Sequence, residues 1–136
     1  MVAGRYSHRT WLTRALSSLY KNEDLLIYNP TGLFNNIVPD YSLVEFVTTI
    51  LSTFSCGSNS YNHHTCILGS CDSMICKDII SVAIDYFNSS SNLVFQDHTV
   101  PNWIIDYSDA RDLGFCPVPT EHALKYLLES LYPKSR

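Results

Sequence analysis

Apolar residues follow a helical spacing in some stretches of this 136-residue chain and form short, strand-like runs in others. From Thr10 to Lys21 they recur every three or four positions, which predicts an amphipathic helix with Thr10 as its N-cap. From Leu43 to Phe54 the same spacing predicts a second helix that buries a wide face. Apolar runs at 25–28 and 33–38 flank an Asn-Pro-Thr-Gly turn and predict two strands. Such changes of period indicate an α/β or α+β fold in which helices dominate.

The second half of the chain repeats the alternation of strand, loop and helix. His64 to Leu68 is an apolar run of strand length, and Asp72 or Ser73 is the expected cap of the helix that follows it. Asn92 to Phe95 is a further predicted strand. This order of elements favours an α/β arrangement over an all-helical one.

A helical turn and an amphipathic helix are the last predicted elements. Ser108 to Leu113 predicts the turn, which Gly114 is expected to stop in the left-handed conformation. Pro117 and Pro119 stiffen the connection to Thr120, the expected cap of the final helix.

The composition suits one globular domain over residues 1–136. Apolar residues make up 46% of the chain, which is enough for a hydrophobic core. The net charge of −4 is spread without blocks, so neither nucleic acid nor an anionic membrane is an electrostatically favoured partner. No apolar stretch approaches the roughly 20 residues of a membrane span, and the N-terminus lacks a signal-peptide pattern. We therefore expect a cytoplasmic protein that binds a small molecule or another protein.

The cysteines favour reduced thiols over disulfides or a metal centre. There are five of them, an odd number without regular spacing: Cys56, Cys66, Cys71, Cys76 and Cys116. A zinc site is the alternative, because His63 and His64 lie within fourteen residues of three of these cysteines. The chain has no C-x-x-C pair, and Cys76 falls on an apolar helix face, so we expect no metal.

The C-terminal run IIDYSDARDLGFCPVPTEHALKYLLESLY, from Ile104 to Tyr132, resembles the end of extended short-chain dehydrogenases/reductases. In this NAD-dependent epimerase/dehydratase group, an Asp-Ser-x-Ala-Arg-x-Leu-Gly-Phe/Trp-x-Pro segment precedes the last helix. YNPTGLFNNIV, from Tyr28 to Val38, is similar to the family's short strand pair, or hairpin, and residues 63–87 are similar to its following strand and helix. Ser42 stands where the family usually has a capping Asp. The resemblance implies the C-terminal portion of a Rossmann-like α/β enzyme, with helices, a few short strands and an incomplete sheet.

The residues that this family uses for cofactor binding and catalysis do not occur in the chain. A dinucleotide site needs closely spaced glycines in a strand-to-helix turn, and the five glycines here are scattered. The family's acid/base Tyr is followed four residues later by Lys, and none of the nine tyrosines has that neighbour. The nearest imitation is Tyr107 with Arg111. We therefore expect the cofactor-binding part, which holds NAD or NADP in the parent family, to be absent, and we assign no catalytic residue.

The resemblance implies that the chain supplies part of a pocket for a nucleotide sugar or a similar small molecule. By position, the candidate substrate-binding residues are His8, Arg9, Trp11, Phe34, Asn35 and Asn36. Arg9 suits a bidentate contact with a diphosphate, and Asn35 or Asn36 suits a sugar hydroxyl or the edge of uracil. Simpler interpretations stay open, because Arg9 also fits a solvated position before a helix and Trp11 a place in the core. Many family members carry an Arg in the hairpin, and this chain has none there.

The sequence leaves two classes of function open. The first is a C-terminal fragment of an NAD(P)-dependent epimerase, dehydratase or reductase, which lacks its N-terminal half. Such a fragment is expected to expose an apolar face and unpaired strand edges at Val2 and at residues 64–68, and to form a homodimer or join its missing half. The second is a non-catalytic binding or scaffold module, which is expected to cover those edges and to be a monomer.

Overall fold

The computed structural model describes residues 2–3, 10–54, 65–97, 102 and 104–134. Within these residues the helices are α1 Trp11–Tyr20, α2 Asp40–Phe54, α3 Cys76–Phe87, α4 Ser108–Asp112 and α5 Thr120–Leu131. The strands are β1 Val2–Ala3, β2 Leu25–Tyr28, β3 Leu33–Phe34, β4 Val38–Pro39, β5 Met74–Ile75 and β6 Leu93–Gln96. No described helix has both the length and the apolar content needed to cross a membrane.

The described strands pair in twos and do not form one sheet. β1 runs parallel to β4, β2 runs parallel to β6, and β3 is antiparallel to β5. The predicted hairpin of residues 28–38 is therefore wrong, because its two strands pair with other parts of the chain. The predicted strand 33–38 is also interrupted, since Asn35 turns its amide to the backbone of Ser70 and Ile105 rather than continuing a ladder.

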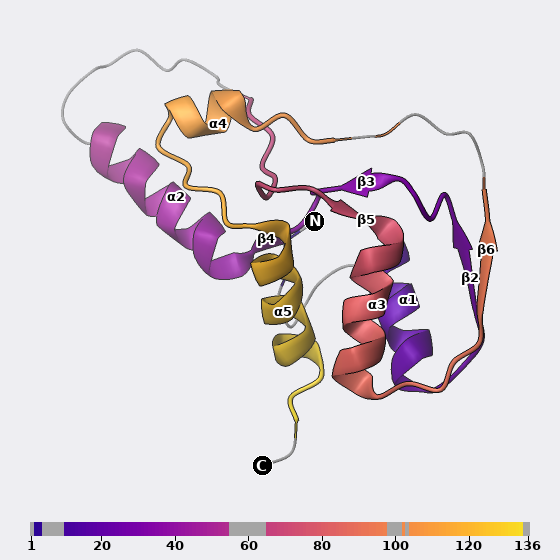
Figure 1. Cartoon of the computed structure of the whole chain (residues 1–136). Coiled ribbons are helices and arrows are strands. Elements are labelled where there is room, and N and C mark those ends of the chain that lie inside the picture. The colour runs from indigo at the N-terminus through magenta and orange to yellow at the C-terminus, as the bar shows by residue number, and fades with distance from the viewer. Residues whose placement is uncertain (1, 4–9, 55–64, 98–101, 103, 135–136) are drawn as a thin grey trace.

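The main hydrophobic core lies between α1, α3, α5 and β2 (Figure 1). Its thirteen buried residues come largely from the apolar faces of the three helices: Leu12, Ala15, Leu16, Leu19, Ile27, Ile37, Ile79, Ile80, Ala83, Ala123, Leu124, Leu127 and Leu128. The helical spacing seen in the sequence thus produces the packing expected of it. At about 1.5–3 kcal/mol for each large aliphatic side chain, this core is the principal source of stability.

A second, smaller core joins α2 to α4. Its buried members are Val38, Phe46, Ala110 and Phe115. The rings of Phe46 and Phe115 meet edge to face, with centroids 5.4 Å apart. The prediction that α2 buries a wide face is wrong, because Val44, Val47 and Leu51 are exposed.

Three predictions of local structure are confirmed. The Thr10 side chain accepts a hydrogen bond from the Thr13 N–H at the start of α1. β6 lies within one residue of its predicted position. Gly114 follows α4 with φ of +96°, the left-handed region that suits glycine.

The predicted caps of the other helices are wrong. α2 begins at Asp40, so Ser42 lies inside the helix, and its hydroxyl is buried with no hydrogen-bond partner in the described structure. α3 begins at Cys76 rather than near Asp72 or Ser73, because Met74–Ile75 pair with β3 first.

The region between residues 65 and 71 also differs from its prediction. Thr65 to Leu68 form no strand, and His64 lies outside the described residues. Cys71 instead makes a single parallel bridge to Pro119. Thr120 is the first residue of α5, and its hydroxyl donates to the Cys71 carbonyl at 3.0 Å. The Thr120 side chain therefore holds this loop in place through a hydrogen bond and does not cap the helix.

Candidate functional site

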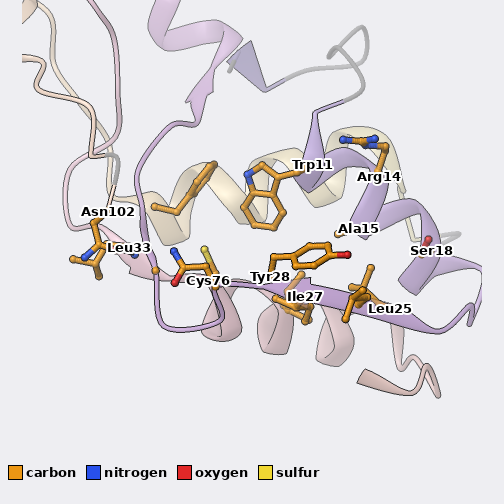
Figure 2. A pocket seen from close by; sticks show the side chains of 15 residues that line it. Trp11, Arg14, Ala15, Ser18, Leu25, Ile27, Tyr28, Leu33, Cys76 and Asn102 are labelled. Atoms are coloured by element: carbon orange, nitrogen blue, oxygen red, sulfur yellow. Dashed lines mark hydrogen bonds between the residues drawn. The ribbon is translucent and has the colours of Figure 1, made fainter. Parts of the chain in front are cut away.

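A cavity of about 490 Å³ lies between α1, β2, the turn before β3 and the first residue of α3. Figure 2 shows the side chains around it, with Trp11 and Arg14 arriving from α1 and Tyr28 from β2. Most of the lining is apolar, with a few polar groups at its margins. This combination is typical of small-molecule sites, where apolar surface supplies affinity and a few polar groups fix orientation.

Aromatic side chains border the cavity on two sides. Trp11 is 39% exposed and Tyr28 is 57% exposed, although both are large and partly apolar. Phe34 supports Trp11 in an edge-to-face contact, with ring centroids 5.3 Å apart and an interplanar angle of 87°. The indole is therefore held in one orientation while part of its surface stays open to the cavity.

The backbone of β2 adds hydrogen-bonding groups to this wall. The Leu25 N–H donates to the carbonyl of Asn92, immediately before β6, at 2.9 Å, and the Asn29 N–H donates to the carbonyl of Gln96 in β6 at 3.1 Å. Backbone groups alternate in direction along a strand, so those of Leu26 point to the opposite edge. Leu26 is among the residues that line the cavity.

Polar side chains lie at the margins of the cavity. Arg14 comes one turn after Trp11 on α1, and it forms no ion pair with any residue that the structure describes. Asn102 also borders the cavity, and its Oδ1 accepts the Leu33 N–H at 3.0 Å, which fixes the entrance to β3. An arginine without a carboxylate partner suits a phosphate or carboxylate on the ligand.

Cys76 contributes a thiol to the lining. Burial raises the pKa of this thiol above its ordinary value. At neutral pH it is therefore protonated, and it contributes apolar surface rather than a nucleophile.

The structure describes four of the six candidate substrate-binding residues and places them in different surroundings. Trp11 and Phe34 lie together in the cavity wall. Asn35 is buried elsewhere, with its amide occupied by backbone groups, and Asn36 is exposed and makes an interaction of its own. His8 and Arg9 lie outside the described residues.

Sequence reasoning missed Arg14, Ser18, Tyr28 and Asn102, all of which line the cavity. A signal for two of them was present, because Trp11, Arg14 and Ser18 follow one another at spacings of three and four on one helix face. Tyr28 carried no comparable signal. Its position depends on the pairing of β2 with β6, about 70 residues away, which no local pattern reveals.

The described residues do not fit a dinucleotide. Gly32, Gly69 and Gly114 are the described glycines, and none lies between a strand and the helix that follows it. The β4–α2 junction instead has Pro39 followed by Asp40, whose carboxylate disfavours a phosphate at that helix end. Hydride transfer therefore cannot be assigned to these residues.

The described structure contains no group of three His, Cys, Asp or Glu side chains that could hold a metal. The four described cysteines are free thiols: Cys66, Cys71, Cys76 and Cys116. Cys56, His63 and His64 lie outside the described residues, so the predicted absence of a zinc site stays a prediction there.

Comparison with protein families and curated proteins finds no match for this chain. Solved structures match it closely in fold. UDP-glucose 4-epimerase from Thermotoga maritima, with UDP-glucose, has a TM-score of 0.68 and 17% identity over 95% of this chain and 42% of its own. UDP-glucuronic acid 4-epimerase from Bacillus cereus, with UDP-glucuronic acid and NAD, has a TM-score of 0.70 and 15% identity over 96% and 42%. dTDP-glucose 4,6-dehydratase from Bacillus anthracis, with NAD, has a TM-score of 0.68 and 7% identity over 95% and 41%.

These matches confirm the resemblance that the sequence predicted, at the level of the fold. The chain spans about two fifths of the length of the solved structures it matches. It has the fold of the C-terminal portion of the Rossmann-like extended short-chain dehydrogenases/reductases that act as epimerases and dehydratases.

Proposed function

We propose that this chain binds the nucleotide end of a nucleotide sugar in the cavity beside α1 and β2. In this proposal it is the substrate-binding part of an NAD(P)-dependent epimerase, dehydratase or reductase. The observation that carries the proposal is the exposed aromatic surface of Trp11 next to the strand edge at Leu26. Two of the matched structures are complexes with UDP-glucose or UDP-glucuronic acid, which supports a nucleotide sugar as the ligand.

The aromatic surface suits a nucleobase. Bases stack on aromatic side chains with a gain of about 1–3 kcal/mol each, and every base has a flat face that can do so. Trp11 is the stronger candidate platform, because Phe34 fixes its orientation from one side. Tyr28 extends the aromatic surface along β2.

The strand edge suits a pyrimidine in particular. Uracil and thymine present an imide edge, in which an N–H donor lies between two carbonyl acceptors. The N–H and C=O of Leu26 supply one donor and one acceptor, which complement two adjacent groups of that edge. A pyrimidine nucleotide is therefore the ligand that this wall fits best.

Arg14 orients the bound nucleotide in this proposal. With the base on Trp11, the diphosphate is expected to extend toward the guanidinium one turn farther along α1. A charge-assisted, bidentate contact is the strongest hydrogen bond available in this cavity. The NAD or NADP would supply hydride chemistry from outside the described residues, and the part of this chain is to bind and orient the substrate.

Titration calorimetry of the isolated chain with UDP, UDP-glucose and uridine tests the proposal. We expect UDP and UDP-glucose to bind and Trp11→Leu to weaken both by about tenfold or more, which corresponds to about 1.4 kcal/mol. Tyr20→Leu is the matched control, because Tyr20 is an exposed aromatic residue on the same helix that does not line the cavity. Arg14→Gln should weaken UDP binding and leave uridine binding nearly unchanged.

The outcomes separate the two classes of function. Absence of UDP binding at millimolar concentration, or equal binding by the Trp11→Leu and Tyr20→Leu variants, would contradict the proposal. A non-catalytic scaffold module would then be the better description of the chain.

A further inference from the structure

The outer edge of strand β6 has no strand beside it in the part of the chain that the structure describes. β6 pairs with β2 alone, and Figure 1 shows it at the margin of the molecule. The Gln96 carbonyl accepts the Asn29 N–H, so Gln96 turns its backbone groups toward β2. Because backbone groups alternate in direction along a strand, Val94 does the same, and the N–H and C=O groups of Leu93 and Phe95 point outward.

The side chains of β6 do not protect this edge. The strand Leu93–Gln96 has no charged residue and no proline. Val94 is 50% exposed and Phe95 is 51% exposed. Proteins usually block a free edge with a charge, a proline, a bulge or a covering segment, because an open edge pairs readily with another strand. An uncharged edge with two exposed apolar side chains is therefore suited to strand pairing.

A second copy of β6 complements this edge when the two strands run antiparallel. A two-fold axis at Val94 places this residue opposite its counterpart and each Phe95 opposite the Leu93 of the other copy. The outward N–H and C=O groups of Leu93 and Phe95 then bond to each other in both of these pairs. The two valines meet on one face of the sheet, and each phenyl ring lies beside a leucine on the other. Cross-strand pairs of this kind stabilise antiparallel strands.

The polar residues at the ends of β6 favour the same register. With the axis at Val94, Asp97 lies opposite the Ser91 hydroxyl of the other copy. The two Asp97 carboxylates are then about 20 Å apart along the strands, which is more than twice the Debye length in physiological salt. An axis at Phe95 would instead place each Asp97 carboxylate opposite the apolar side chain of Leu93. Charge therefore selects one pairing among those that the backbone allows.

We propose that two copies of this chain join through the outer edges of β6 and form one continuous sheet in the order β2–β6–β6–β2. A two-fold axis relates the copies, so the contact is closed and produces a dimer rather than a filament. An extended segment of another protein is the alternative occupant, but the match of β6 with itself in backbone groups, apolar side chains and charge favours a second copy. The proposal is independent of the ligand proposed for the cavity, because no residue of β6 lines it.

Sedimentation velocity of the 136-residue chain at a series of concentrations tests the proposal. We expect the dimer fraction to rise with concentration. Val94→Lys should raise the dissociation constant by about tenfold or more, because it sets two ammonium groups opposite each other at the two-fold axis. Val94→Glu should do the same with two carboxylates. An equal mixture of the two variants should recover the dimer, since each lysine then lies opposite a glutamate.

The control is Val44→Lys, which makes the same change at an exposed valine on α2. It should dimerise like the unmodified chain. Circular dichroism shows whether each variant folds, and recovery in the mixture requires that both variants keep the β6 edge. An unmodified chain that stays monomeric at about 1 mM would overturn the proposal and leave the edge to another protein. A dimer that Val94→Lys and Val44→Lys weaken equally, or that the mixture does not recover, would overturn it as well.

Discussion

Asn35 joins three separate segments of the chain through one buried side chain. Its Nδ2 donates to the carbonyl oxygens of Ser70 and Ile105 at 3.1 and 2.9 Å, and its Oδ1 accepts the Ile105 N–H at 2.8 Å. The Ser70 hydroxyl donates back to the Asn35 carbonyl and also contacts the Thr120 hydroxyl at 2.8 Å. The side chain is 2% exposed, so water does not compete for these bonds. Phe34, in the wall of the cavity, is the residue immediately before it.

We predict that Asn35→Leu lowers the free energy of unfolding by about 3–6 kcal/mol. The change keeps the branched shape of the side chain but removes all three side-chain hydrogen bonds, and each polar group left unsatisfied in the interior costs about 1–3 kcal/mol. Three such groups together would cost about 3–9 kcal/mol. The lower half of that range applies, because Ile105 is partly exposed and water can replace some of its lost hydrogen bonds. Such a loss is a large share of the roughly 5–15 kcal/mol that stabilises a typical domain.

Urea unfolding followed by circular dichroism measures this loss. Asn92→Leu is the matched control, because Asn92 is exposed and its side chain makes no hydrogen bond in the described structure. If Asn35→Leu were within about 0.5 kcal/mol of that control, the hydrogen-bond network would not hold the segments together and the reasoning would fail. Asn35→Asp adds a second check.

The Asp variant places a carboxylate against two carbonyl oxygens, which raises its folded-state pKa. A group with a raised folded-state pKa stabilises the protein below its unfolded value of about 3.9 and loses that contribution as the pH rises. The variant should therefore lose stability above about pH 4 relative to the unmodified protein.

Three further predictions test other features of the structure. Gly114→Ala should destabilise the protein by about 1–2 kcal/mol in thermal unfolding, because its φ is +96° and a Cβ would lie 3.0 Å from the Thr49 methyl group; an unchanged midpoint would contradict the left-handed conformation. Tyr126→Phe should cost about 1 kcal/mol, since it removes the 2.5 Å hydrogen bond to Asp40. That bond raises the pKa of Tyr126, so its contribution to stability is present below about pH 10 and is lost above it. Between pH 7 and pH 11 the free energy of unfolding should therefore fall less for the variant than for the unmodified protein. Lys125→Ala should leave the unfolding midpoint unchanged, because the 2.6 Å ion pair between Lys125 and Glu121, one turn earlier in α5, is exposed to solvent.

The sequence was sufficient where local periodicity decides the structure. α1, α3 and α5 appear at or near their predicted positions, because each places apolar residues on one face that a neighbouring helix can bury. The stop at Gly114 was also predictable, since few other residues adopt that backbone conformation without strain. The resemblance to extended short-chain dehydrogenases/reductases depended on the order of such elements, and the fold confirms it.

The sequence was insufficient where distant segments decide the structure. The Pro-Gly turn after Tyr28 favoured a hairpin, and its turn residue Asn29 does take a left-handed conformation. The strand before it nevertheless pairs with β6, because α3 carries the chain back alongside. Asn35 is a second case in which distant residues matter. It was predicted to contact a ligand together with Asn36, and its side chain is hydrogen-bonded to Ser70 and Ile105, which lie 35 and 70 positions later in the sequence.

The cavity and helix α2 are supported by different hydrophobic cores, so each can be perturbed separately. Trp11 and Tyr28 are carried by α1 and β2, whose buried residues belong to the core of thirteen, whereas α2 is attached through the core of four. Because buried apolar area is the main source of stability, opening of α2 costs less free energy than opening of α1. Changes on α2 therefore leave the cavity formed, whereas changes in the main core remove it. Helices α1 and α2 have similar apolar spacing, so the sequence does not reveal this difference. The spacing shows which residues can be buried, but it does not show how much of the rest of the protein packs against them.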